Sequence, residues 1–110
     1  MRFQQIDEEF AVAPQITAGD IAAIAKAGFK SIVCNRPDTE MGAVPHEAIA
    51  KAAQAAGLEF RFIPVGGFGG NNPVPEMVGA LKEMPRPMLA YCRSGARSAN
   101  LYMAASQMVR

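Results

Sequence analysis

The sequence has little of what several classes of protein need. Its formal net charge is only +1, so we expect no broad basic surface and no nucleic acid as a partner. No apolar run approaches the ~20 residues that span a bilayer. The first ten residues, MRFQQIDEEF, lack the apolar core of a secretory signal. We therefore expect no membrane partner and a cytoplasmic location.

Cysteine and histidine are also scarce. Two cysteines in a chain without a signal predict reduced thiols rather than a disulfide framework. His46 is the only histidine, and no second ligand stands near it in the sequence, so no metal site is expected. No cofactor is expected either, and any chemistry must come from the side chains themselves.

What the sequence does contain is a regular alternation of helix and strand patterns over 110 residues, the size of one domain (1–110). The expected helices cover residues 16–28, 46–57, 75–84 and 95–108, and the expected strands cover residues 9–15, 29–35, 58–65 and 87–92. This order predicts an α/β fold with a mostly parallel central sheet of four to five strands and helices on both faces. The last residues, SQMVR, fall inside an expected helix without a glycine stop, as in a chain truncated at its C-terminus.

The stretch YCRSGARSANLY, residues 91–102, is the candidate for catalysis. Cys92 ends an apolar strand, Gly95 lets the next loop turn tightly, and a helix follows. Ligands bind at the carboxyl ends of strands in such sheets, and a helix N-terminus directs N–H groups and positive potential there. A thiol in that field ionises more easily, so Cys92 is predicted to be a nucleophile. The alternative is a buried, unreactive thiol at a strand end.

The residues around Cys92 are predicted to hold an anionic substrate. Arg97 offers a fork of donors to an oxyanion and keeps the loop closed, so we expect it to act with Cys92. Arg93 is expected to point outward and attract the substrate. Ser98 is expected to cap the helix or donate to the thiolate. Substrate-binding positions are predicted at Arg93, Ser94, Gly95, Ala96, Ser98 and, after another strand, Arg36, for which a structural ion pair is an equal alternative.

The segment CRSGARS, residues 92–98, resembles the active-site loop of the rhodanese-type sulfurtransferases, in which the cysteine carries a persulfide. The rest of the chain is similar to the phosphatase-like domain of beta-lactamase hydrolase-like proteins, through AGFKSIVCNRPD, AAGLEFRFIPV and PMLAYCRSGARSANL. That domain is related in fold to the dual-specificity tyrosine phosphatases. The likeness covers nearly the whole chain, and NRPD and YCRSGxRS are its most specific parts. It implies a cysteine-phosphatase or rhodanese-like fold.

Two features favour attack on sulfur rather than on phosphorus. The resembling phosphatases have five residues between cysteine and arginine, whereas here four residues, 93–96, separate Cys92 from Arg97, which is the rhodanese length. Such phosphatases also place an Asp to protonate the leaving oxygen, usually between the last two strands. The corresponding segment, residues 66–86, contains no Asp. Sulfane transfer needs no such acid, because sulfite or a thiolate leaves.

Three further positions keep alternatives open. Asp38 is the possible acid if the protein is a phosphatase, although Asp in an RPD sequence more often caps a turn or pairs with Arg36. Cys34 could resolve a persulfide, but a buried cysteine in a strand is more often an inert hydrophobe. The segment GGFGGNN is interpreted as a mobile rim, with Phe68 covering the pocket.

The sequence therefore predicts a sulfurtransferase that moves sulfane sulfur through a Cys92 persulfide. Its partners would be a small anionic sulfur donor, thiosulfate or a low-molecular-weight persulfide, and a thiol acceptor. One alternative is a cysteine-dependent phosphatase of the dual-specificity or tyrosine type. Another is a sulfur-carrier module, for which the resemblance implies a metallo-β-lactamase-fold persulfide dioxygenase as the partner.

Overall fold

The computed structural model describes residues 2–66 and 72–109, and it confirms the predicted α/β fold. The strands are β1 (Gln4–Asp7), β2 (Phe10–Ala13), β3 (Ser31–Cys34), β4 (Glu59–Phe62) and β5 (Met88–Tyr91). The helices are α1 (Ile21–Lys26), preceded by the 3-10 turn η1 (Ala18–Asp20), α2 (His46–Ala55), α3 (Pro73–Glu83) and α4 (Ala96–Ser106). Every element expected from the sequence is present, and each is shorter than or shifted slightly from its predicted range.

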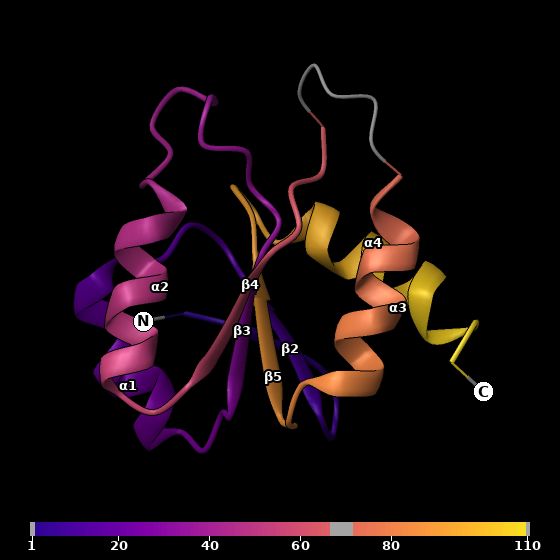
Figure 1. Ribbon diagram of the computed structural model, residues 1–110, viewed down its shortest axis with the longest axis horizontal. Coiled ribbons are helices and arrows are strands. Elements are labelled where there is room, and N and C mark those ends of the chain that lie inside the picture. Colours follow the sequence, from indigo (N-terminus) through magenta and orange to yellow (C-terminus); the bar gives the residue numbers. More distant parts are fainter. Residues whose placement is uncertain (1, 67–71, 110) are drawn as a thin grey trace.

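The strands form one sheet in the order β1-β2-β5-β3-β4. Four of them are parallel, and only β1 runs antiparallel, beside β2 at one edge. Strand β5 lies in the middle, where Met88 pairs with Phe10 of β2 on one side and Ser31 of β3 on the other. Figure 1 shows α1 and α2 on one face of this sheet and α3 and α4 on the other.

Each face of the sheet has its own apolar core because successive side chains of a strand point to opposite faces. On β5, Leu89 and Tyr91 join the core that contains the buried residues of α1 and α2. Met88 and Ala90 join the core that contains those of α3 and α4. All four side chains are fully buried, so the strand reads in the sequence as a continuous apolar run.

Strand β1 is the element that the sequence patterns missed. Its residues are exposed or half-buried and show no apolar alternation. It forms because it pairs with β2 and because the Tyr102 hydroxyl of α4 donates a hydrogen bond to the Asp7 carboxylate. Burial, and then this bond to Asp7, raise the pKa of Tyr102 to about 12. Strand β1 is thus fastened to both the sheet and the last helix.

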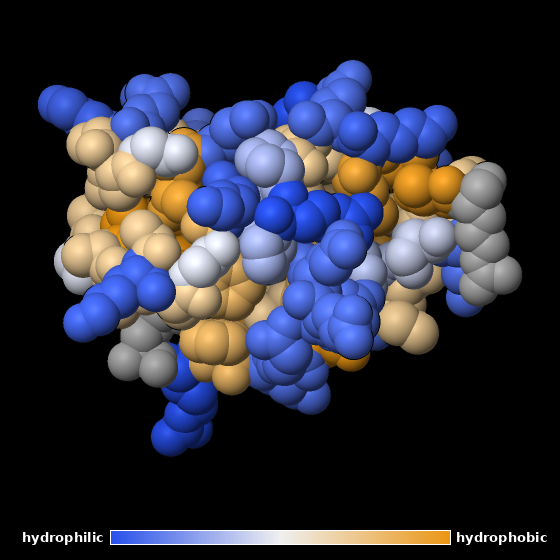
Figure 2. Space-filling view, turned by 90° about the horizontal axis from the view of Figure 1, so that it is seen from below, coloured by the Kyte–Doolittle hydropathy of each residue, from blue (hydrophilic) through white to orange (hydrophobic). Residues whose placement is uncertain are grey.

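The parallel strands all end at the same edge of the sheet, toward the top of Figure 1. The segments that follow β2, β3, β4 and β5 meet there. Figure 2 views the molecule from below, at the opposite end, where hydrophilic residues run across the middle of the surface. Across residues 2–66 and 72–109, no helix has the length and apolar character to cross a membrane.

Candidate active site

Cys92 directly follows β5 and is fully buried at the carboxyl end of the central strand. The loop after it turns at Gly95, whose φ of 98° lies in the left-handed region that favours glycine. This turn directs the Gly95 N–H at the Cys92 Sγ, at 3.0 Å. A Cβ at Gly95 would meet Val12 and Ala13 of β2 at 3.5 and 3.6 Å. The loop is therefore packed closely against the end of the neighbouring strand.

Several N–H groups surround the sulfur of Cys92. Burial by itself would raise the pKa of this thiol, but hydrogen bonds from the backbone N–H groups of Ser98, Gly95 and Ser94 outweigh it. The buried Ser98 hydroxyl also acts to lower the pKa, although it makes no hydrogen bond within the described part of the chain. The pKa of Cys92 is thus held below its ordinary value, as expected for a thiolate nucleophile at a helix N-terminus.

Replacement Ser98→Ala is expected to raise the pKa of Cys92. Loss of a hydroxyl that can donate to the charged thiolate costs about 1.5 kcal/mol, and the more basic thiolate regains part of the rate, so alkylation near neutral pH should slow by about threefold. The pH profile of iodoacetamide alkylation at Cys92 measures this. Its midpoint should lie at higher pH in the variant than in the wild type, because less thiolate forms at a given pH.

Replacement Ser106→Ala is the matched control, since that hydroxyl donates to the Met103 carbonyl at the far end of the same helix. Its midpoint should equal that of the wild type. An unchanged midpoint in Ser98→Ala would show that the hydroxyl does not act on the sulfur.

Arg97, on the first turn of α4, points toward the loop that follows β3. Its Nη1 and Nη2 donate to the two carboxylate oxygens of Glu40 at 2.5 and 2.9 Å, and Nη1 also donates to the Val65 carbonyl at 3.0 Å. Glu40 is the main cause of a raised Arg97 pKa, and Cys92 contributes to the same shift. Arg97 therefore interacts with both Glu40 and Cys92, but its terminal fork is bound to the carboxylate.

Arg36 is the buried support of that same loop, with only 5% of its surface exposed. Its guanidinium donates to Glu40 Oε1 at 3.1 Å, to Gln15 Oε1 at 3.0 Å and to the Met41 carbonyl at 2.7 Å. The structural ion pair that we weighed against substrate binding is therefore present. The substrate-binding role of Arg36 stays a prediction.

Asp38 contacts the start of α2 rather than Arg36. One carboxylate oxygen accepts from the His46 N–H at 2.9 Å, and the other lies 2.7 Å from His46 Nδ1. Of the two commoner roles given above for Asp38, the pairing with Arg36 is not formed, because Arg36 is already satisfied by Glu40 two residues further along the loop. The expected role of Asp38 as an acid stays a prediction.

The two cysteines have opposite environments. Burial raises the pKa of Cys34, whose thiol donates to the Arg36 carbonyl at 3.4 Å from within the core beside α1 and α2. Cys92, by contrast, faces the N–H groups of its own loop. Both are free thiols. This contrast favours the inert role for Cys34, and its role in resolving a persulfide stays a prediction.

The other predicted loop positions lie at the surface or support the turn. Arg93 is exposed, as expected, and its carbonyl accepts from the Gln15 N–H at 3.3 Å. The Ser94 hydroxyl is exposed and accepts from the Ala96 N–H at 3.3 Å. Phe68 and most of the glycine-rich segment around it lie outside the described residues.

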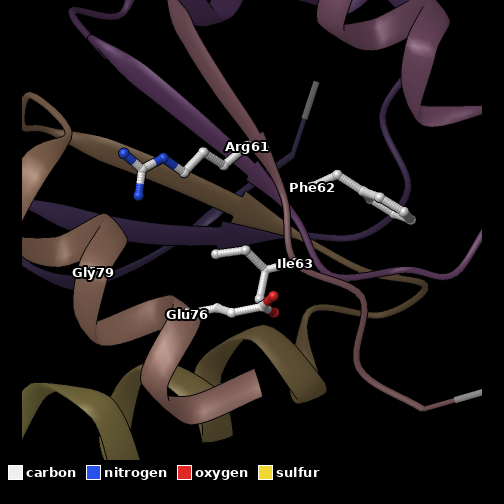
Figure 3. Close-up of a pocket in the computed structure, with 5 residues that line it drawn as sticks. All are labelled: Arg61, Phe62, Ile63, Glu76 and Gly79. Atoms are coloured by element: carbon white, nitrogen blue, oxygen red, sulfur yellow. The ribbon is translucent and has the colours of Figure 1, made fainter. Parts of the chain in front are cut away.

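Two hollows open on the surface near these elements. The smaller, of about 320 Å³, is lined by Arg61, Phe62, Ile63, Glu76 and Gly79. It lies between β4 and α3, and none of its lining residues belongs to the Cys92 loop (Figure 3). The larger, of about 510 Å³, is lined by Arg2, Phe3, Gln4, Val12, Pro14 and Ser94. Only this second hollow borders the Cys92 loop, through Ser94.

Sequence reasoning missed two contributors to this region. Glu40 lies 57 residues from Arg97 in the sequence and belongs to no motif, so only the folded chain shows that they pair. The N-terminal residues 2–4 border the hollow beside Ser94 because β1 folds back on β2. Because strand β1 was not predicted, the part of the hollow that residues 2–4 line could not be predicted either.

The mostly parallel α/β sheet and the cysteine of lowered pKa in the loop before a helix are features of a cysteine-phosphatase-like domain. The comparison with known families agrees with this class. The chain belongs to the family described as the beta-lactamase hydrolase-like protein, phosphatase-like domain, which matches residues 2–109.

Individual relatives support the same class. The beta-lactamase hydrolase-like protein of Agrobacterium fabrum is 33% identical over 94% of this chain, and the chain spans 24% of that protein. A candidate phosphatase from Neisseria meningitidis has a solved structure that is 32% identical, with a TM-score of 0.79, and covers 93% of this chain and 74% of its own. One from Shewanella putrefaciens, at 19% identity and a TM-score of 0.81, covers 94% of this chain and 69% of its own and shows the fold alone.

These comparisons confirm the phosphatase-like part of the resemblance. They support the phosphatase alternative better than sulfur transfer, and the rhodanese-type interpretation of the loop still depends on residue spacing alone. Because the chain spans about a quarter of its curated relative, that protein's description applies to a longer molecule.

Proposed function

We propose that the domain transfers sulfane sulfur through a persulfide on Cys92. The observation that carries this proposal is the geometry of the short loop. The Gly95 N–H donates to the Cys92 sulfur at 3.0 Å, and the N–H groups of Ser98 and Ser94 also lower the pKa of that thiol, while the terminal fork of Arg97 is bound to Glu40. Phosphoryl transfer depends on charged groups directed at the phosphoryl oxygens. A persulfide has only one terminal sulfur to stabilise, which N–H groups can do without a free guanidinium.

The proposed first step is attack by the Cys92 thiolate on the outer sulfur of the donor. The donor's S–S bond breaks, and its electron pair leaves on sulfite when the donor is thiosulfate, or on a thiolate when the donor is a persulfide. A new S–S bond forms on Cys92, and its terminal sulfur keeps one negative charge. The loop N–H groups and the N-terminus of α4 then stabilise that charge. In the second step an acceptor thiolate takes the outer sulfur and Cys92 is regenerated.

The hollow beside Ser94 supplies room for such a donor. Its volume of about 510 Å³ exceeds what thiosulfate or a small persulfide needs, and Arg2 at its wall is a cation that would attract an anionic group. An acceptor thiol could use the same space. A persulfide dioxygenase domain in a longer chain remains the proposed partner if the domain acts as a sulfur carrier.

A cysteine-dependent phosphatase is the second candidate, and the family and its solved relatives favour it. Cys92 would then attack phosphorus, and an acid would have to protonate the leaving oxygen. Asp38 is the candidate, although both its oxygens now contact His46. The phosphatase would therefore need Asp38 to leave α2 before it could act.

The experiment that tests the proposal is intact mass spectrometry of the reduced protein after incubation with thiosulfate or with an alkyl persulfide. We expect an added mass of about 32 Da, one sulfur, which cyanide removes. A Cys92→Ser variant should stay unmodified.

No adduct from either donor, together with Cys92-dependent hydrolysis of an aryl phosphate, would overturn sulfur transfer in favour of the phosphatase. In that case Asp38→Asn would identify the acid. If the wild type forms the persulfide, Asp38→Asn should form it equally well.

A further inference from the structure

We propose that Glu40 is a specificity-determining residue of the Cys92 site, which selects sulfur donors of low charge, organic persulfides, over the thiosulfate dianion. The choice of substrate class rests on the proposed sulfur transfer. The role of Glu40 itself, which is to keep multiply charged anions from Arg97, does not depend on which atom Cys92 attacks.

The first step is the occupancy of Arg97. Glu40 accepts from both of its terminal nitrogens, at 2.5 and 2.9 Å, in the bidentate geometry that a bound oxyanion would otherwise use. The Val65 carbonyl accepts a further bond from Nη1 at 3.0 Å. An anionic substrate that required this fork would have to displace a carboxylate already bound to it.

The second step is that Glu40 is fixed in place. Its Oε1 also accepts from Arg36 Nε at 3.1 Å, and Arg36 is buried and tied to Gln15 and to the Met41 carbonyl. A carboxylate held by two arginines, one of them buried, is less free to move than the carboxylate of an isolated surface ion pair. Displacing it would disturb the loop between β3 and α2 as well.

The third step is the charge balance around the sulfur. The positive charges of Arg36 and Arg97 are matched by the carboxylate of Glu40 and the thiolate of Cys92, so no net positive charge remains for a dianion. Arg93 and Arg2 are exposed, so solvent and salt screen the attraction that their charges exert on an anion. A donor that brings one negative charge or none meets little repulsion here, whereas thiosulfate brings two.

Competing alkylation tests this role without assuming any enzymatic activity. Iodoacetate carries a negative charge and iodoacetamide is its neutral counterpart, so the ratio of their rates at Cys92 reports the local charge. We expect Glu40→Gln to raise the ratio of the iodoacetate rate to the iodoacetamide rate by about fivefold, the effect of one partly exposed charge pair. Peptide mass spectrometry assigns the adduct to Cys92 rather than Cys34.

Two further variants complete the comparison. Glu83→Gln removes an acidic residue of α3 whose ion pair is with Arg61 of β4, and it should leave the ratio as in the wild type. Glu40→Asp keeps the charge and should also keep the low ratio. With sulfur donors, Glu40→Gln should raise kcat/KM for the thiosulfate dianion about fivefold and raise that for an alkyl persulfide, which carries a single negative charge, by less.

A ratio in Glu40→Gln equal to that in Glu83→Gln would overturn the role of Glu40. If Glu40→Gln does not fold, the wild type decides: its ratio should be no higher than that of a free small-molecule thiol, and a higher ratio contradicts the proposal. A shifted ratio without any persulfide would reject sulfur transfer and keep the role of Glu40. Persulfide formation with an unshifted ratio would support sulfur transfer and reject the role of Glu40.

Discussion

Replacement Cys92→Ser is expected to lower the rate of sulfur transfer by at least about a thousandfold, the scale on which loss of a covalent nucleophile acts. The N–H groups of Ser98, Gly95 and Ser94 hold the pKa of the Cys92 thiol below its ordinary value. A serine hydroxyl starts far higher and would stay protonated in the same place. Thiocyanate formation from an alkyl persulfide and cyanide measures the rate.

Replacement Cys34→Ser is the matched control for the other thiol. It lies on the neighbouring strand β3, where burial raises its pKa, so its loss should change the rate by less than about threefold. Circular dichroism should show the native fold in both variants. Equal loss of activity in the two variants would mean that Cys34 takes part in the transfer, and retained activity in Cys92→Ser would remove Cys92 as the sulfur carrier.

The second large effect is expected on stability. Leu89→Ala should lower the free energy of unfolding by about 3 kcal/mol, because it removes a fully buried side chain from the central strand and leaves a cavity. Leu89 lies in the core beside α1 and α2, between two parallel neighbours, so little can move in to fill the space. Urea denaturation followed by circular dichroism measures the change.

Met103→Ala on α4 is the control for this large-to-small change, since that side chain is about half exposed (54%). It should cost less than about 0.5 kcal/mol. Each folded Leu89→Ala molecule should still react at Cys92 as the wild type does. A loss in Leu89→Ala no larger than that in Met103→Ala would mean that the core beside α1 and α2 repacks around the gap.

The elements that could be predicted from the sequence are those buried on one or both faces. Strand β5 and helix α4 each carry a burial pattern that the residues themselves display, and Cys92 falls at their junction. Strand β1 could not be predicted, because its stability comes from pairing with β2 and from the Tyr102–Asp7 hydrogen bond rather than from its own residues.

In the site as well, the parts that could be predicted are local in the sequence, and the others depend on contacts between distant segments. The nucleophile, the glycine turn and the serine are neighbours in the chain, so a short motif contains them all. The fork of Arg97 is different, since its orientation depends on Glu40 and on a carbonyl after β4. A residue type and a spacing show that an arginine is present, but only the folded loops show which group it binds.

Helix α4 connects the Cys92 loop to the edge strand β1. Ser98 on its first turn lowers the pKa of the Cys92 thiol, and Tyr102 one turn later donates a hydrogen bond to Asp7 on the edge strand. Any motion that pulls β1 from the sheet therefore also acts on α4, the helix whose first turn lowers the pKa of Cys92. We therefore expect the N-terminal hairpin to be needed to keep Cys92 reactive, although no residue of that hairpin donates to the sulfur. In a longer polypeptide, a domain boundary placed after β1 would remove the strand that holds α4 in position beside Cys92.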